Sequence, residues 1–82
     1  MYIKSSDESI LLNADRTDLF SVTYNANIKR WDVKAYTSGV NMVLGSYKTK
    51  AQADITLGRL ALAVTDTTCR IFRIPPDTEE EN

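Results

Sequence analysis

The chain has 82 residues, of which 43% are hydrophobic, and it contains ten Lys and Arg residues and eleven Asp and Glu residues. This length supports one modest hydrophobic core and excludes a second domain of ordinary size. The sequence contains one cysteine and no histidine, which excludes an internal disulfide and removes the commonest catalytic base and metal ligand. We therefore expect no enzymatic activity, no metal and no cofactor.

The acidic residues are concentrated at the C-terminal end. Four of the eleven, Asp77, Glu79, Glu80 and Glu81, lie in the last six positions, which leaves seven acids against ten bases elsewhere. We expect residues 1–76 to form a single domain and residues 77–82 to form an acidic disordered tail. The domain then carries a net charge of about +3, which is well below the basic stripe of a dedicated nucleic-acid-binding domain.

The sequence has no segment that predicts contact with a membrane. The first residues show neither the basic nor the apolar part of a signal peptide, and the longest apolar run is 60–64. A membrane-spanning helix needs about 20 apolar residues. We expect a cytoplasmic protein.

Strand-like segments separated by turn signals fill the first half of the chain. They combine short runs of β-branched, aromatic and aliphatic residues with flanking Asn, Asp, Ser and Gly. The segments expected to be strands are 2–5, 10–13, 19–24, 31–37, 40–47 and, after a helix, 69–74. In the clearest of them, 31–37, alternation predicts that Trp31, Val33 and Ala35 face the core while Asp32, Lys34 and Tyr36 face outward.

One helix is expected between the last two strands. Residues 49–52 (TKAQ) match a capping box, in which the threonine hydroxyl accepts a hydrogen bond from the amide three residues later. The helical pattern continues to about Thr65, and residues 66–68 end it. One apolar stripe should pack on the sheet, and its members are Ala53, Leu57, Leu60, Ala61 and Val64. The expected fold is thus α+β, with a five- to six-stranded antiparallel meander and one helix on one sheet face.

The helix also has a second apolar set. At about 100° per residue, Ala51, Ile55 and Leu62 fall within about 40° of one another, roughly opposite the first stripe, and Gly58 lies beside them. Two interpretations stay open. Either another part of the chain covers this face, or the face is a partner surface, most simply a two-fold helix-to-helix contact between two copies.

Several short motifs resemble a group of small uncharacterised proteins from phages and prophages of Gram-positive bacteria. The similar segments are 2–5 (YIKS), 12–13 (LN), 44–50 (LGSYKTK) followed by Ala53 and Leu57, and 71–75 (IFRIP). The resemblance covers most of the chain and implies a phage or prophage origin. This sequence differs from the group within the helix, where Ile55, Gly58 and Leu62 stand at positions that are usually polar.

These observations favour a non-enzymatic binding or assembly protein that acts through protein–protein contact, with a second copy or a host or phage protein as partner. The alternative is a nucleic-acid-binding accessory protein that uses a basic sheet edge, since cations interleaved with aromatic residues can neutralise phosphates and stack on bases. The residues expected at such an edge are Lys29, Arg30, Lys34, Tyr36, Arg70 and Arg73.

Overall fold

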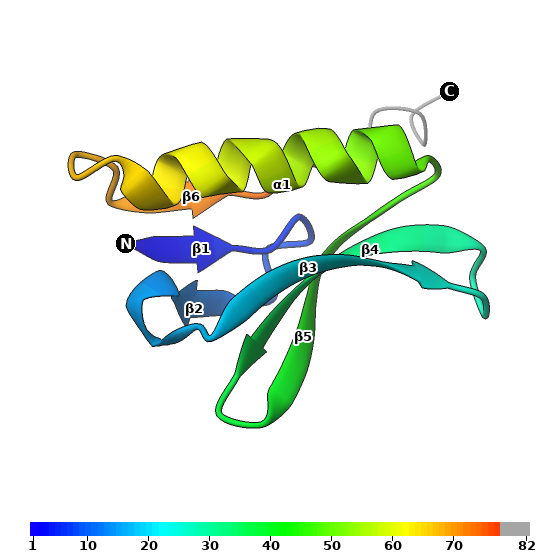
Figure 1. Ribbon diagram of the computed structural model, residues 1–82, viewed down its shortest axis with the longest axis horizontal. Helices are drawn as coiled ribbons and strands as arrows, with labels where there is room; N and C mark the ends of the chain where they lie inside the picture. Colours follow the sequence, from blue (N-terminus) through cyan, green and yellow to red (C-terminus); the bar gives the residue numbers. More distant parts are fainter. Residues whose placement is uncertain (78–82) are drawn as a thin grey trace.

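The computed structural model describes residues 1–77, so the part of the predicted disordered tail at positions 78–82 lies outside the described residues. It contains six strands, one α-helix and one short 3₁₀ turn, η1 (Figure 1). In chain order the elements are β1 (Tyr2–Lys4), β2 (Leu11–Asn13), η1 (Ala14–Arg16), β3 (Leu19–Asn25), β4 (Arg30–Thr37), β5 (Val40–Tyr47), α1 (Lys50–Thr65) and β6 (Ile71–Arg73). The α+β class expected from the sequence is confirmed.

The strands form two three-stranded sheets, so the prediction of one continuous meander is wrong. Sheet A has the order β2-β1-β6, and sheet B has the order β3-β4-β5. Only sheet B is an antiparallel meander; in sheet A, β1 pairs antiparallel with β2 but parallel with β6. The 16 residues of α1 span about 24 Å, which carries the chain back along the molecule so that β6 runs in the same direction as β1.

Sheet B bends where Gly45 lies. The register pairs Val33 with Gly45 and Lys34 with Val43, so Leu44 is an extra residue in β5. A Cβ atom on Gly45 would lie 3.0 Å from Cγ2 of Ile74 and 3.1 Å from Oη of Tyr47. The missing side chain therefore allows the segment after β6 to pack closely on β5.

The core lies between α1 and the two sheets. Its buried residues come from four of the strands, the helix and the segment that follows β6: Ile3, Leu12, Val33, Ala35, Leu44, Tyr47, Ala53, Leu60 and Ile74. Trp31 is partly buried at its margin, where its ring centroid lies 5.0 Å from that of Tyr24. No helix among residues 1–77 has the length and apolar character needed to cross a membrane.

Helix α1 begins and ends where the sequence predicts, but its buried face is rotated. Thr49 caps the first turn by accepting a hydrogen bond from the amide of Gln52, and Asp66 caps the end. The buried residues are Ala53, Thr56 and Leu60, whereas Ala61 and Val64, which were expected in the core stripe, are exposed. Thr56 can enter the core because its hydroxyl donates to the carbonyl of Gln52 at 3.1 Å. A prediction based on apolar residues alone overlooks a threonine whose hydroxyl forms its hydrogen bond within its own helix.

The prediction that Asp32 faces solvent is also wrong, because this residue is only 1% exposed. The strand alternates as expected, and Asp32 lies on the face opposite Val33, beside Thr23 of β3 and Ser46 of β5. Its carboxylate accepts hydrogen bonds from Oγ of Ser46 at 2.6 Å and from Nδ2 of Asn25 at 3.2 Å. These donors explain how a carboxylate can be buried on the second face of sheet B.

Candidate functional site

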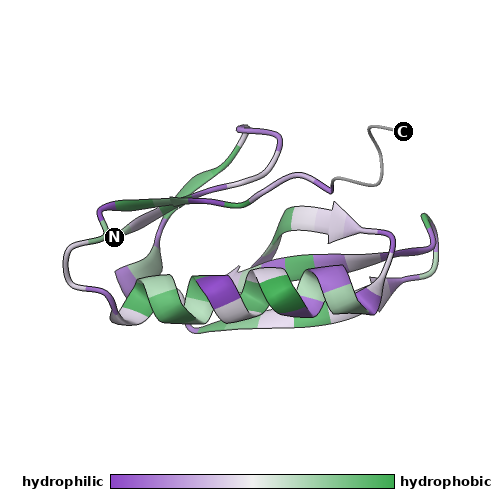
Figure 2. Cartoon of the chain, turned by 90° about the horizontal axis from the view of Figure 1, so that it is seen from above, coloured by the Kyte–Doolittle hydropathy of each residue, from purple (hydrophilic) through white to green (hydrophobic). Residues whose placement is uncertain are grey.

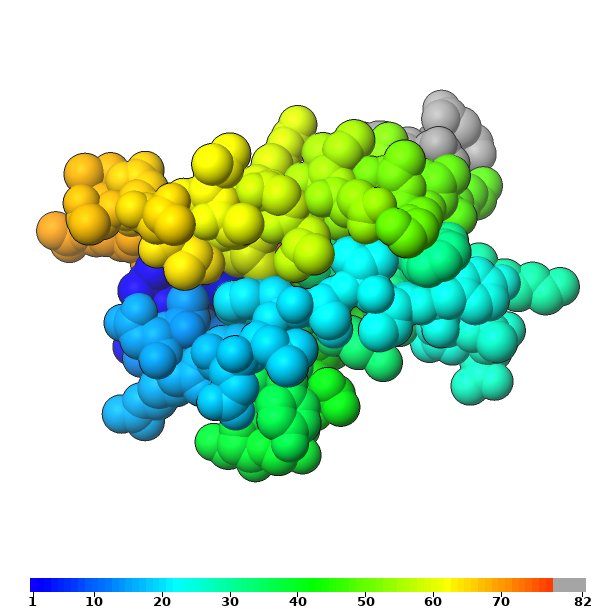
Figure 3. All heavy atoms as spheres, viewed as in Figure 1, coloured from blue at the N-terminus to red at the C-terminus, as the bar shows by residue number. Residues whose placement is uncertain are grey.

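The face of α1 that points away from the sheets is the candidate binding surface. We call it the outer face, and it consists of Ala51, Ile55, Gly58 and Leu62. All four residues are exposed, and Leu62 and Ile55 retain 73% and 51% exposure. In the space-filling view, α1 forms the upper edge of the molecule (Figure 3). Residues 1–77 therefore leave both large aliphatic side chains of the outer face in contact with solvent.

Gly58 leaves open space in the middle of the outer face. A Cβ atom built on Gly58 would meet no atom within 4 Å, so no neighbouring group of this chain occupies that space. The view onto the helix shows hydrophobic and hydrophilic residues alternating along α1 (Figure 2). Ala51 and Gly58 are small, whereas Ile55 and Leu62 are large. Short and long side chains therefore alternate along the outer face.

Charged residues border the outer face on both sides. At about 100° per residue, Asp54 lies along one margin of the stripe and Arg59 along the other. Nζ of Lys50 contacts Oδ2 of Asp54 at 2.8 Å in an exposed pair separated by four residues. Arg59 has no ion-pair partner within residues 1–77. The surface thus combines an apolar centre with one acidic and one basic margin.

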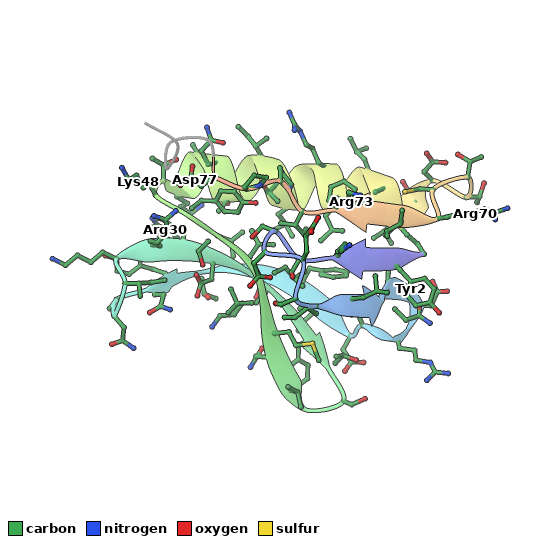
Figure 4. The ribbon with its side chains drawn as sticks, turned by 180° about the vertical axis from the view of Figure 1, so that it is seen from behind. Tyr2, Arg30, Lys48, Arg70, Arg73 and Asp77 are labelled. Carbon is green, nitrogen blue, oxygen red and sulfur yellow. The ribbon has the colours of Figure 1, made fainter. Side chains whose placement is uncertain are left out.

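The six residues expected at a basic sheet edge do not form one surface. Arg30 and Arg70 lie at opposite ends of the molecule, as Figure 4 shows. Nη2 of Arg30 contacts Oδ2 of Asp77 at 2.8 Å and the carbonyl oxygen of Ser46 at 3.1 Å, and only 16% of the Arg30 side chain is exposed. This guanidinium is committed to an internal contact. Lys29 lies in the turn between β3 and β4, whereas Lys34 and Tyr36 lie in the central strand β4 and are partly buried.

The remaining two cations lie beside sheet A. Arg70 precedes Ile71, which is paired with Tyr2 of β1, and Arg73 follows Ile71 by two positions. All four residues are exposed. Figure 4 shows Tyr2 and Arg73 on the side of the molecule that carries β1 and β6. Nη1 of Arg73 lies 3.5 Å from Oε1 of Glu8, in a pair that is largely exposed on both sides. This smaller group joins one aromatic ring with two cations, and the sequence pattern did not single out Tyr2 as a member.

Sequence reasoning also missed the role of Asp77. This residue was assigned to the tail, yet its side chain is fully buried. Its Oδ2 atom accepts hydrogen bonds from Arg30 of β4 and from the backbone amide of Lys48, at 2.8 and 2.9 Å. The hydroxyl of Tyr47 donates to the carbonyl of Pro75 two residues earlier. No local pattern identifies these contacts, because they join positions 28 to 47 residues apart.

Among residues 1–77 three groups have shifted pKa values, and each shift has a structural cause. Hydrogen bonds from the side chain and backbone of Ser9 and from the side chain of Ser5 lower the pKa of Asp7 to about 2. Hydrogen bonds from Thr68 lower the pKa of Asp66 in the same way. Burial raises the pKa of Tyr47, and the negative charge of Asp77 adds to this effect. The two carboxylates lie in solvent-exposed turns, where such bonds stabilise local structure.

Two concave surfaces lie away from the outer face of α1. Two pockets of about 430 and 190 Å³ lie beside the Ser5–Ser9 turn, where the chain runs past it after β6. Lys4, Glu8 and Arg73 are among the residues that line the larger pocket. Among residues 1–77 no group of three carboxylate or thiol side chains is arranged as a metal site. The charged pair in the larger pocket is the exposed contact between Arg73 and Glu8.

Comparisons with known proteins give no relative for this chain. No family model matches the sequence, and no curated protein and no solved structure matches it either.

Proposed function

We propose that this protein is a non-enzymatic binding protein of phage or prophage origin that acts in the cytoplasm through protein–protein contact. The observation that carries the proposal is the exposure of Leu62 and Ile55 on one face of α1. Scattered apolar residues are ordinary on protein surfaces, but an aligned apolar face bordered by charges is typical of an interaction site. The resemblance of its short motifs to phage and prophage proteins supports the proposed origin.

The expected strength of such a contact follows from the buried area. Complete burial of one Leu or Ile side chain contributes about 1.5–3 kcal/mol. Because Leu62 and Ile55 are already 27% and 49% buried in the free chain, both together contribute roughly 2–4 kcal/mol per copy. Association opposes this with at least about 4 kcal/mol of lost translational and rotational freedom. The outer face alone therefore supports a reversible contact.

A capture experiment with matched variants tests this proposal. Tagged wild-type protein, Leu62→Glu and Ile28→Glu are each used to retain proteins from a lysate of a Gram-positive host. Ile28 is a suitable control because it is 52% exposed and lies in the turn between β3 and β4, outside the outer face. We expect wild type and Ile28→Glu to retain the same partner or a second copy, and Leu62→Glu to lose it. Equal retention by all three proteins would contradict the proposal.

A second function is favoured by the exposed group of Tyr2, Arg70 and Arg73. A half-exposed aromatic ring beside two cations can stack on an unpaired base while the cations neutralise phosphates. The test is the mobility of a single-stranded oligonucleotide over a range of salt concentrations. Nucleic-acid binding predicts a shift that weakens as salt rises and that is lost in Tyr2→Ala. Absence of any shift at low salt excludes this function.

A further inference from the structure

We infer that the occupant of the outer face is a second copy of this chain, with the two α1 helices parallel and in register. This inference rests on the proposed function and adds the identity and orientation of the partner. The four outer-face residues, 51, 55, 58 and 62, are spaced by four, three and four positions. This is the spacing of the contact positions in a two-stranded coiled coil, where alternate steps of three and four keep one stripe toward the partner.

The side chains at these positions fit a close parallel pair. In a parallel pair each contact residue meets the same residue of the partner, so layers of small residues alternate with layers of large ones. Ile55 and Leu62 occupy the positions conventionally called a, and Ala51 and Gly58 occupy the positions called d. The open space at Gly58 permits the two backbones to approach.

The charged margins decide the orientation. In this frame Asp54 is at position g and Arg59 is at position e of the following heptad, five residues later. A parallel pair places g of one helix beside the next e of the other, so each Asp54 faces Arg59 of the partner subunit. An antiparallel pair instead places Asp54 beside its own copy and Arg59 beside its own copy. The parallel orientation therefore gives two attractive contacts where the antiparallel one gives repulsion.

The contact of Asp54 with Lys50 is compatible with this arrangement. The Lys50 ammonium bonds only Oδ2 of Asp54, which leaves Oδ1 for a second donor. The two folded bodies do not compete for space at the contact, because Ala53, Thr56 and Leu60 hold the opposite face of each helix against its own sheets. About four residues per copy form the centre of the contact, against roughly 20–30 in a stable interface, so the dimer should dissociate reversibly.

A charge-exchange series tests the orientation by sedimentation equilibrium. Asp54→Arg and Arg59→Asp should each raise the dimer dissociation constant roughly tenfold, because two attractive pairs become repulsive. The double variant restores both pairs and should return the constant to near the wild-type value. Arg16→Asp, which changes an exposed charge in η1 away from α1, should have no effect. Failure of the double variant to recover would overturn the parallel register.

Disulfide formation gives a second and independent readout. In a Cys69→Ser background, Ile55→Cys and Leu62→Cys are prepared separately and oxidised under mild conditions. Both variants should form covalent dimers, since in a parallel pair each position meets itself. Crosslinking at one position alone, or at neither, contradicts the register. If wild type stays monomeric at every concentration while Leu62→Glu still loses a captured partner, the second copy is excluded and the proposed protein–protein contact stands.

Discussion

Replacement of Asp77 by asparagine should substantially lower the free energy of unfolding, although position 77 lies outside the regular elements. The carboxylate joins β4, the end of β5 and the C-terminal segment, since it accepts from Arg30 and from the amide of Lys48. Asparagine keeps nearly the same volume and one acceptor oxygen, but it removes the negative charge. Arg30 is then left with a largely buried positive charge and a weaker partner.

The magnitude follows from the burial of the two groups. The Asp77 side chain is 0% exposed and that of Arg30 is 16% exposed. Breaking a buried ion pair by removing one partner costs about 3–5 kcal/mol. The loss should lie near the lower end of that range, about 3 kcal/mol, because Arg30 keeps its hydrogen bond to the carbonyl of Ser46. For a domain of this size, that corresponds to a fall in Tm of about 12–24 °C.

Urea unfolding followed by tryptophan fluorescence measures this effect, since Trp31 is the one tryptophan in the chain. Asp15→Asn is a matched control, because Asp15 has 81% side-chain exposure and, within residues 1–77, its ion-pair contact is with the N-terminal amine at 3.8 Å. The double variant Asp77→Asn with Arg30→Gln should lose less free energy of unfolding than the sum of the losses in the two single variants, because both substitutions remove the same interaction. A change below about 1 kcal/mol for Asp77→Asn would refute the assigned role of this carboxylate.

Three further predictions concern single positions. Gly45→Ala should lower the free energy of unfolding by about 1–3 kcal/mol, because the new methyl group overpacks the core. Gly58→Ala should raise the free energy of unfolding by about 0.5–1 kcal/mol, because alanine has the higher helix propensity and its methyl group meets open space. Urea unfolding measures both changes. Thr49→Ala should destabilise the domain by about 1 kcal/mol through loss of the helix cap, again by urea unfolding. Because the pKa of Asp7 falls from 3.8 to about 2 on folding, its stabilising contribution is present above about pH 4 and lost as the pH drops toward 2. In an NMR titration, Ser9→Ala should raise that pKa toward 3.8.

Local signals predicted the individual elements of this fold well. The threonine cap, the polar residues that follow Thr65 and the period-two pattern of 31–37 act over a few residues, so each could be recognised without the rest of the chain. Strand pairing could not be recognised in this way. Strands β1, β2 and β6 have three residues each, which is too short for a pattern of alternation to specify a partner or a direction.

The candidate site shows the same division between local and distant information. The prediction of the outer face of α1 depends only on helical periodicity. Its exposure in residues 1–77 is compatible with a partner surface but does not identify the partner. The proposed basic edge depended on where distant segments meet. Arg30 was assigned to it from its charge and its closeness in sequence to aromatic residues, but Asp77, 47 residues later, holds that guanidinium inside the domain. Sequence separation of this size conceals the pairing from any local pattern.

The most direct test of the contact surface is an NMR dilution series of wild-type protein. If two copies meet through α1, the amide signals of Ala51, Ile55, Gly58 and Leu62 should shift together as the concentration rises, while those of β2 stay fixed. All four signals should then report one dissociation constant. Signals of α1 that stay constant up to millimolar concentration, or shifts confined to sheet A, would contradict the account.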